Sequence, residues 1–278
     1  MRSWSDPVLL RLGSFELRWY GLILAAAIYA STAALAQLLR HRGHRDPWDE
    51  AAGLAAWLIP AGLLGARLGF VVQNLSYFAS YPAQILATWT GGLSIHGALL
   101  GGLAALALRE RSRTGFLARA DLLLTVLPLG QAIGRWGNLF NREVLGYPTH
   151  LPWGLYVEPA FRPAAFRASA TFHPVFLYES LADLALFAWL WWRASGSGER
   201  SDRTPRPGST APPLLAPPPG AQAALYLAGY AVIRFGLEFV RIGTPVLLGL
   251  TLAQWVSGGL LAGLAAWRVT ARSPARRG

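Results

Sequence analysis

The stretch that decides the fold runs from Leu122 to Gly146 and reads LLLTVLPLGQAIGRWGNLFNREVLG. Its first half, up to Ile133, is almost entirely apolar. Its second half carries two arginines, two asparagines and a glutamate within nine residues: Arg135, Asn138, Asn141, Arg142 and Glu143. Ionisable groups at the edge of an apolar run are costly unless they have a partner or a task, so this polar group is the first candidate site.

The composition predicts a membrane protein. Of the 278 residues, 53% are hydrophobic and only 14% are charged. Because a helix needs about 20 mostly apolar residues to cross the hydrocarbon core, we expect an all-α polytopic fold with seven transmembrane helices. The expected spans are Tyr20–Leu39, Ala51–Val72, Leu93–Leu108, Asp121–Arg135, Pro174–Trp192, Gln222–Arg241 and Leu250–Trp267.

The basic residues predict the orientation of the chain in the membrane. All 25 are arginine, and they gather after the first, third, fifth and seventh spans, at 40–45, 109–119, 193–206 and 268–277. The second loop, 73–90, carries no charge. Because arginine concentrates in cytoplasmic loops, we expect the N-terminus outside and the C-terminus in the cytoplasm, although Arg2, Arg11 and Arg18 run against this pattern. The net charge of +11 therefore indicates topology, and we expect no nucleic-acid partner.

We expect a single transmembrane catalytic domain over residues 1–278. Residues 139–171 contain two proline-bearing turns and are expected to form an external arm between the fourth and fifth helices. Residues 195–220 are rich in Pro, Gly, Ser and Arg, which is typical of a disordered cytoplasmic linker. Glycine pairs at four-residue spacing indicate close helix packing: Gly65/Gly69, Gly97/Gly101, Gly130/Gly134 and Gly259/Gly263.

The polar end of the fourth helix admits two interpretations. If the helix continues, Arg135, Asn138 and Arg142 project from one side. Arginine suits bidentate phosphate binding, and the asparagines can donate hydrogen bonds to ester or glycerol oxygens. Alternatively, Arg135 or Arg142 forms a structural salt bridge with Glu143.

A second polar stripe lies on the sixth helix, in YAVIRFGLEFVR. Tyr230, Arg234, Glu238 and Arg241 follow one another at helical spacing. Arg234 and Glu238 can simply pair. Two arginines and one glutamate nevertheless leave a surplus positive charge near lipid, which favours an anionic ligand.

Two histidines stand at the starts of apolar helices. His96, in GGLSIHGALLGG, is either a packing residue with one hydrogen bond or a proton acceptor at neutral pH. His173, in FHPVFLYES, precedes a helix start; we favour a cap and a structural Glu179 there over an anion site. The two histidines lack metal-ligand spacing and the chain has no Cys, so we expect no metal and no thiol nucleophile.

Taken together, these motifs resemble the prolipoprotein diacylglyceryl transferase family. The central match is Gly134–Gly146, with Arg135, Asn138, Asn141 and Glu143 in place. Further matching motifs, in the family's order, are RWYGL at 18–22, GARLG at 65–69, GGLSIHGALLGG at 91–102, PTHLPWG at 148–154, HPVFLYES at 173–180 and RFGLEFVR at 234–241. The sequence departs from the family at Ala98, where a second glycine is common, and in a longer linker at 195–220.

The resemblance implies a multi-pass enzyme of the bacterial inner membrane that needs no cofactor. Such an enzyme moves the diacylglyceryl group of phosphatidylglycerol to the lipobox cysteine thiol in the signal peptide of a prolipoprotein. A thioether forms and glycerol 1-phosphate leaves. Phosphate departure needs positive charge arranged in advance, and a thiol with a reference pKa of about 8.5 needs help to ionise.

The motifs suggest a role for each candidate. Arg135 and Arg234 would form the phosphate clamp, with Glu238 and Arg241 behind them, and His96 would take the thiol proton. The residues expected to orient the head group are Tyr20, Asn138, Asn141, Glu143 and Tyr230.

A second class of function is a protein that binds or transports anionic lipid without chemistry. A transporter would usually contain inverted repeats or paired broken helices, and the sequence shows neither. A non-catalytic relative would be expected to lose His96 or Arg135, and both are present.

Overall fold

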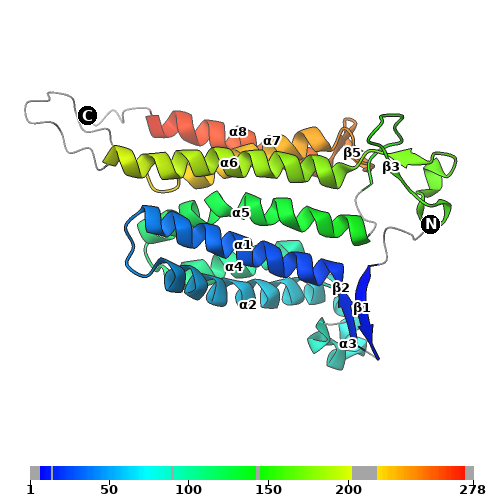
Figure 1. Cartoon of the computed structure of the whole chain (residues 1–278), viewed down its shortest axis with the longest axis horizontal. Coiled ribbons are helices and arrows are strands. Elements are labelled where there is room, and N and C mark those ends of the chain that lie inside the picture. The colour runs from blue at the N-terminus through cyan, green and yellow to red at the C-terminus, as the bar shows by residue number, and fades with distance from the viewer. Residues whose placement is uncertain (1–6, 14, 89–90, 142–144, 202–217, 273–278) are drawn as a thin grey trace, which may run out of the picture. The chain divides into compact units, whose positions relative to one another are not determined.

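The computed structural model describes residues 7–13, 15–88, 91–141, 145–201 and 218–272. Within these ranges the chain is mostly helical (Figure 1). A helix lies at each of the seven expected positions: α1 (Trp19–His41), α2 (Pro47–Gln73), α4 (Ile95–Arg109), α5 (Arg113–Asn141), α6 (Val175–Ser201), α7 (Ala221–Leu237) and α8 (Leu252–Arg272).

Four of the described helices are long and apolar enough to cross a membrane. They are α1, α2, α5 and residues 175–196 of α6. Helices α4 and α7 are apolar but shorter. Because lipid offers the backbone no hydrogen-bond partners, a helix is the form that such apolar runs adopt in a bilayer.

The connections contain small elements that the all-α expectation missed. Three antiparallel pairs are formed, by β1 (Val8–Leu12) with β2 (Phe15–Arg18), β3 (Leu155–Tyr156) with β4 (Thr171–Phe172), and β5 (Pro245–Leu247) with β6 (Leu250–Thr251). Short helices are α3 (Leu75–Ser80), η1 (Pro82–Leu86), η3 (Pro159–Phe161) and η4 (Ala164–Phe166). These elements satisfy backbone groups that would otherwise be unpaired where the chain turns between helices.

Several helix boundaries differ from the expected spans: α5 begins at Arg113 rather than Asp121, and α7 ends at Leu237 rather than Arg241. Helix α5 continues to Asn141, beyond the expected end at Arg135, and α6 continues to Ser201, beyond Trp192. The first part of the expected 195–220 linker is therefore helical. Its central part, 202–217, lies outside the described residues.

The described chain forms two compact units. One comprises 1–31, 124–217 and 221–278, and is called the arginine unit here because it contains Arg135 and Arg234. The other comprises 32–123 and 218–220, and is called the His96 unit. Helices α1 and α5 contribute to both units.

In the His96 unit, α2 packs against α4 through the predicted glycine pairs. A Cβ on Gly69 would lie 2.9 Å from Gly97 Cα, and a Cβ on Gly101 would lie 3.0 Å from Gly65 Cα. The backbones therefore touch directly, as the spacing predicted. The same prediction is wrong for Gly134 and for Gly259/Gly263, where a Cβ would meet nothing within 4 Å.

In the arginine unit, α6 and α7 run side by side (Figure 1). Leu186 and Leu190 of α6 and Tyr226 of α7 form a buried core between these helices. Helix α6 is fixed to α5 by Ser180, whose hydroxyl donates to the Ala132 carbonyl at 2.7 Å. This packing places the polar faces of α5, α6 and α7 in one unit.

Candidate functional site

The end of α5 carries the first polar group, as the sequence predicted. Because α5 is helical to Asn141, Arg135 and Asn138 project from neighbouring positions one turn apart. Arg142 and Glu143 lie outside the described residues, so a salt bridge between them and Arg135 remains an expectation.

Tyr20 lies against this same turn of α5. A Cβ on Gly137 would come 2.5 Å from Tyr20 Cδ2, so only glycine allows the tyrosine ring to approach so closely. One residue earlier, Trp19 stacks on Phe140 with ring centroids 5.0 Å apart. The start of α1 therefore holds the half-exposed Tyr20 ring beside the turn that bears Asn138.

The partner of Arg135 is Glu179 of α6. Arg135 Nη2 lies 2.5 Å from Glu179 Oε1, and the same nitrogen donates to the Tyr230 hydroxyl at 3.4 Å. Glu179 is fully buried, whereas the Arg135 side chain keeps 24% of its surface exposed. Among the described residues, Arg135 Nη1 and Nε make no hydrogen bond. The guanidinium is thus held on one side and free on the other.

Arg234 of α7 reaches the same carboxylate. Its Nη1 lies 3.5 Å from Glu179 Oε1, and its Nη2 donates to Glu238 Oε1 at 2.7 Å. Glu238 also pairs with Arg241 at 3.5 Å and accepts the Thr251 hydroxyl at 3.0 Å. Arg234 therefore pairs with Glu238, which the sequence left as one alternative, and Arg241 lies beside Glu238 as predicted.

This group of five charged residues, called the arginine–carboxylate cluster, has unused hydrogen-bonding capacity. Arg234 Nη1 and both Glu179 oxygens are buried without a hydrogen-bond partner in the described chain, although Arg234 Nη1 and Glu179 Oε1 belong to the ion pairs. The cluster has three arginines and two carboxylates: Arg135, Arg234, Arg241, Glu179 and Glu238. A single positive charge is therefore in surplus within it.

A third carboxylate lies deeper along α6. Asp183 is one turn beyond Glu179, is fully buried, and neither of its oxygens accepts a hydrogen bond from a described residue. Its electrostatic partners are Glu179, Arg135 and Arg234. The charge of Asp183 thus bears directly on the positive surplus of the cluster.

The other predicted head-group residues described here are Asn138 and Asn141 of α5 and Tyr230 of α7. Asn138 is half-buried and makes no hydrogen bond within the described chain, so its amide is available. Asn141 is exposed at the end of α5. Tyr230 is half-buried and is directly joined to Arg135.

His96 belongs to the other unit. It occupies the first turn of α4, where Ser94 is the N-cap residue and accepts the Gly97 N–H at 3.4 Å. The imidazole is exposed and makes no hydrogen bond to a described residue. The alternative in which His96 is a buried packing residue with one hydrogen bond is therefore wrong.

His173 makes side-chain and main-chain contacts at the start of α6. Its Nδ1 lies 3.1 Å from the Tyr178 hydroxyl, which also accepts the Trp153 indole N–H at 2.8 Å. The His173 main chain pairs with Gly146 and Tyr147 through its carbonyl and N–H. These contacts fasten the start of α6 to the chain that follows α5.

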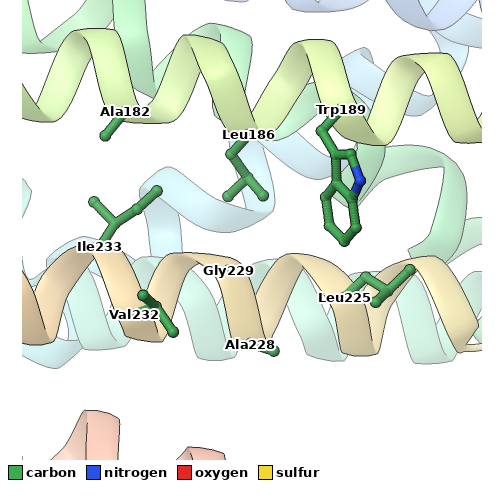
Figure 2. Close-up of a pocket in the computed structure, with 8 residues that line it drawn as sticks. All are labelled: Ala182, Leu186, Trp189, Leu225, Ala228, Gly229, Val232 and Ile233. Carbon is green, nitrogen blue, oxygen red and sulfur yellow. The ribbon is translucent and has the colours of Figure 1, made fainter.

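An apolar groove runs along α6 and α7, the helices that carry Glu179 and Arg234 of the cluster (Figure 2). It begins at Ala182 and Ile233, which adjoin Asp183 and Arg234 in sequence, and extends past Leu186 to Trp189. Its volume is about 380 Å³, and its lining residues are Ala182, Leu186, Trp189, Leu225, Ala228, Gly229, Val232 and Ile233.

Sequence reasoning assigned Glu179 too small a role and missed Asp183. The available signal was the placement of two carboxylates within an apolar span, four residues apart, in a chain with few acids. That signal marks both as unusual. It does not identify Arg135, 44 residues away, as the partner of Glu179.

The fold and the cluster define a class: a mostly helical protein with helices apolar enough to cross a membrane and with paired arginines and carboxylates beside an apolar groove. The family model for prolipoprotein diacylglyceryl transferase matches residues 7–269. The chain belongs to this family.

The match to curated relatives covers most of this chain and most of each relative. The chain is 42% identical to the phosphatidylglycerol–prolipoprotein diacylglyceryl transferase of Synechococcus elongatus, covering 90% of this chain and 82% of that one. It is 38% identical to the protein of the same name from Trichormus variabilis, over 96% and 91% of the two chains. The Fervidobacterium nodosum protein, also so named, is 38% identical over 92% and 82%.

Proposed function

We propose that this chain is a phosphatidylglycerol–prolipoprotein diacylglyceryl transferase, which carries out the first step of bacterial lipoprotein maturation. The lipobox cysteine sulfur attacks the phosphate-bearing carbon of the diacylated glycerol in phosphatidylglycerol. A carbon–sulfur bond forms and the carbon–oxygen bond breaks. The thiol proton is lost, glycerol 1-phosphate leaves, and no cofactor enters the reaction.

The observation that carries this proposal is the arginine–carboxylate cluster. Arg135 and Arg234 converge on one buried Glu179, and each retains hydrogen-bonding capacity that no described residue uses. A phosphate placed between them would accept from the free edge of Arg135 and from Arg234 Nη1. Because the carboxylates hold both guanidinium groups before the lipid arrives, little reorganisation is needed as charge develops on the leaving phosphate.

The remaining residues of the arginine unit would hold the head group in register. Tyr20, Asn138, Asn141 and Tyr230 offer hydroxyl and amide groups on the α1–α5–α7 side, and Glu143 follows in the same motif. Glu238 and Arg241 would orient Arg234 from behind. We assign phosphatidylglycerol binding to these residues together with Arg135.

The groove on α6 and α7 suits an acyl chain of the donor lipid. It is lined by apolar side chains and extends along α6 and α7 from residues that adjoin Asp183 and Arg234 in sequence. A phosphate held by Arg135 and Arg234 would leave the attached diacylglycerol at the mouth of this groove.

His96 is proposed as the base that takes the thiol proton. Its exposed imidazole has no competing hydrogen bond within the described chain, and histidine is the ordinary proton acceptor at neutral pH. We propose seven spans of the bacterial inner membrane, formed by helices α1, α2, α4, α5, α6, α7 and α8. The positions of the arginine clusters support an N-terminus outside and a C-terminus in the cytoplasm.

The proposal is tested with purified protein, phosphatidylglycerol vesicles and a synthetic lipobox peptide. Mass spectrometry should show the peptide gaining one diacylglyceryl group on its cysteine, and a peptide with serine at that position should stay unmodified. Lipid binding with no modified peptide, under conditions where a curated relative is active, would favour a non-catalytic lipid-binding protein.

A further inference from the structure

Arg67 of α2 is the most completely hydrogen-bonded arginine of the His96 unit. Its side chain is buried, with 6% of the residue exposed. Nε donates to the Ile85 carbonyl at 2.8 Å and Nη2 to the Gln84 carbonyl at 2.5 Å. Nη1 donates to the carbonyls of Gly91 and Gly92 at 2.8 and 3.0 Å. One guanidinium therefore ties together both ends of the loop that leads to α4.

The charge of Arg67 is compensated without an acid. Within the described chain no carboxylate pairs with it; four carbonyl dipoles and the rings of Phe70 and Phe78 surround it, with centroids 5.7 and 5.3 Å from its Cζ. A lysine ammonium has only three donors at a single point and cannot reproduce this planar fork. The site therefore requires arginine specifically.

The same stretch of α2 holds the first turn of α4. The Ser94 N–H donates to the carbonyl of Ala66, the residue next to Arg67, at 2.9 Å. Gln73 Nε2 donates to the Ser94 hydroxyl at 2.7 Å. The loop clamped by Arg67 and the N-cap of α4 are thus anchored to one helix, two residues before His96.

The glycine contacts remove the remaining freedom of α4. Gly97, directly after His96, meets Gly69, and the next turn meets Gly65, with no room for a Cβ on either helix. A shift of α4 along α2 would bring backbone into backbone. The contacts with α2 therefore fix the position of α4, and of His96 on it, along the α2 axis.

We propose that Arg67 is a positioning residue for the reaction, acting through His96. It fixes the loop that delivers the chain to Ser94, and so sets where α4 begins and where its imidazole stands. The His96 ring has no hydrogen bond of its own in the described chain, so the described contacts that fix its position are those of this backbone clamp, which act on its main chain. The inference rests on the proposed role of His96 in the transfer.

A double-mutant cycle tests the proposal, with single-turnover rates of thioether formation for wild type, Arg67→Lys, His96→Asn and the double variant. Misplacing a reacting group by about 1 Å can cost about 10²-fold. Arg67→Lys should therefore slow wild type by about 10- to 100-fold, but slow His96→Asn by less than about twofold, because coupled residues are not additive. The KM for phosphatidylglycerol should change little, since the phosphate clamp is in the other unit.

Arg45→Lys, an exposed arginine, serves as the matched control and should be silent. Equal slowing by Arg67→Lys in both backgrounds would overturn the inference, as would a normal rate in Arg67→Lys. If Arg67→Lys does not give a monodisperse protein, Gln73→Ala is used in its place, because Gln73 holds the same N-cap residue, Ser94. The inference then requires Gln73→Ala to slow wild type much more than it slows His96→Asn. Failure of wild type to transfer at all would instead reject the proposed function.

Discussion

Replacement of Arg135 by lysine is the sharpest test of the phosphate clamp. Arg135 uses one nitrogen, Nη2, for both Glu179 at 2.5 Å and the Tyr230 hydroxyl at 3.4 Å, and its other nitrogens are free in the described structure. Lysine keeps the charge but has one nitrogen. It can stay on Glu179 or turn to the phosphate, but it cannot do both with the arginine geometry.

The magnitude follows from the contact that is lost. If lysine remains on the buried Glu179, the phosphate loses one preorganised charged donor. Removing a single donor of this kind costs about 2.7–4 kcal/mol of transition-state stabilisation, or about 10²–10³ in rate. The loss should appear in kcat, because the contact strengthens as the phosphate takes up charge.

The assay measures thioether formation by mass spectrometry, with Arg111→Lys, an exposed arginine between α4 and α5, as the control for the chemical change alone. Melting of the purified protein in detergent shows whether the variant is folded. A folded Arg135→Lys enzyme with near-normal turnover would make Arg135 structural and would refute the clamp.

Four further predictions follow from the same geometry. His96→Asn should be slow at pH 7 by about 10²–10⁴ and recover partly toward pH 9, where the substrate thiol ionises unaided; a mutant-to-wild-type ratio that stays flat with pH would remove the base role. Glu179→Gln should lower the melting point, because breaking a buried ion pair costs about 3–5 kcal/mol, and anionic lipid should restore part of it; an unchanged melting point would contradict this. Ala182→Phe should raise KM for long-chain phosphatidylglycerol about three- to tenfold by displacing packed methylenes, with little effect on short-chain donors, and an equal effect on both would exclude an acyl chain from the groove. In intact cells an impermeant thiol reagent should label Ser76→Cys and leave Arg111→Cys unlabelled, and the reverse result would invert the topology.

The helices were predictable because their cause is local. Runs such as 20–39 and 51–72 are predominantly apolar, although the second contains Arg67, and such a run adopts a helix in lipid because its backbone has no other hydrogen-bond partners. Their ends were less predictable. Hydropathy placed the end of α5 at Arg135, where the composition changes, while the hydrogen-bond ladder continues to Asn141. The small β-pairs escaped notice because strands of two to five residues leave no periodic signal.

The site was predictable where its contacts are short in sequence. Arg234 and Glu238 are four residues apart, at the end of α7 and in the turn that follows it, so their pairing could be inferred from spacing; Arg241 lies three residues beyond Glu238. The pairing of Arg135 with Glu179 depends on how α5 packs on α6, which single-sequence patterns do not specify. The contact of Thr251 with Glu238 could not be predicted either, because it depends on how the turn before α8 folds back toward Glu238.

The position of Arg67 illustrates a third case. Its motif, GARLG, could be recognised as a family feature, but its function as a clamp needs the carbonyls of Gln84 and Gly92 to face it. Backbone acceptors carry no sequence signature. The sequence alone therefore does not distinguish an arginine that is bound by backbone carbonyls from an arginine without a partner.

The most direct test of the account follows both halves of the donor lipid in one reaction. Phosphatidylglycerol labelled with deuterium in its acyl chains and with ¹³C in its head-group glycerol is mixed with excess enzyme and lipobox peptide. The arginine–carboxylate cluster, acting as a phosphate clamp, predicts one deuterated thioether for each ¹³C-labelled glycerol 1-phosphate released, with both products suppressed equally in Arg135→Lys. Peptide modification without release of the labelled head group, or release that is unaffected in Arg135→Lys, would contradict it.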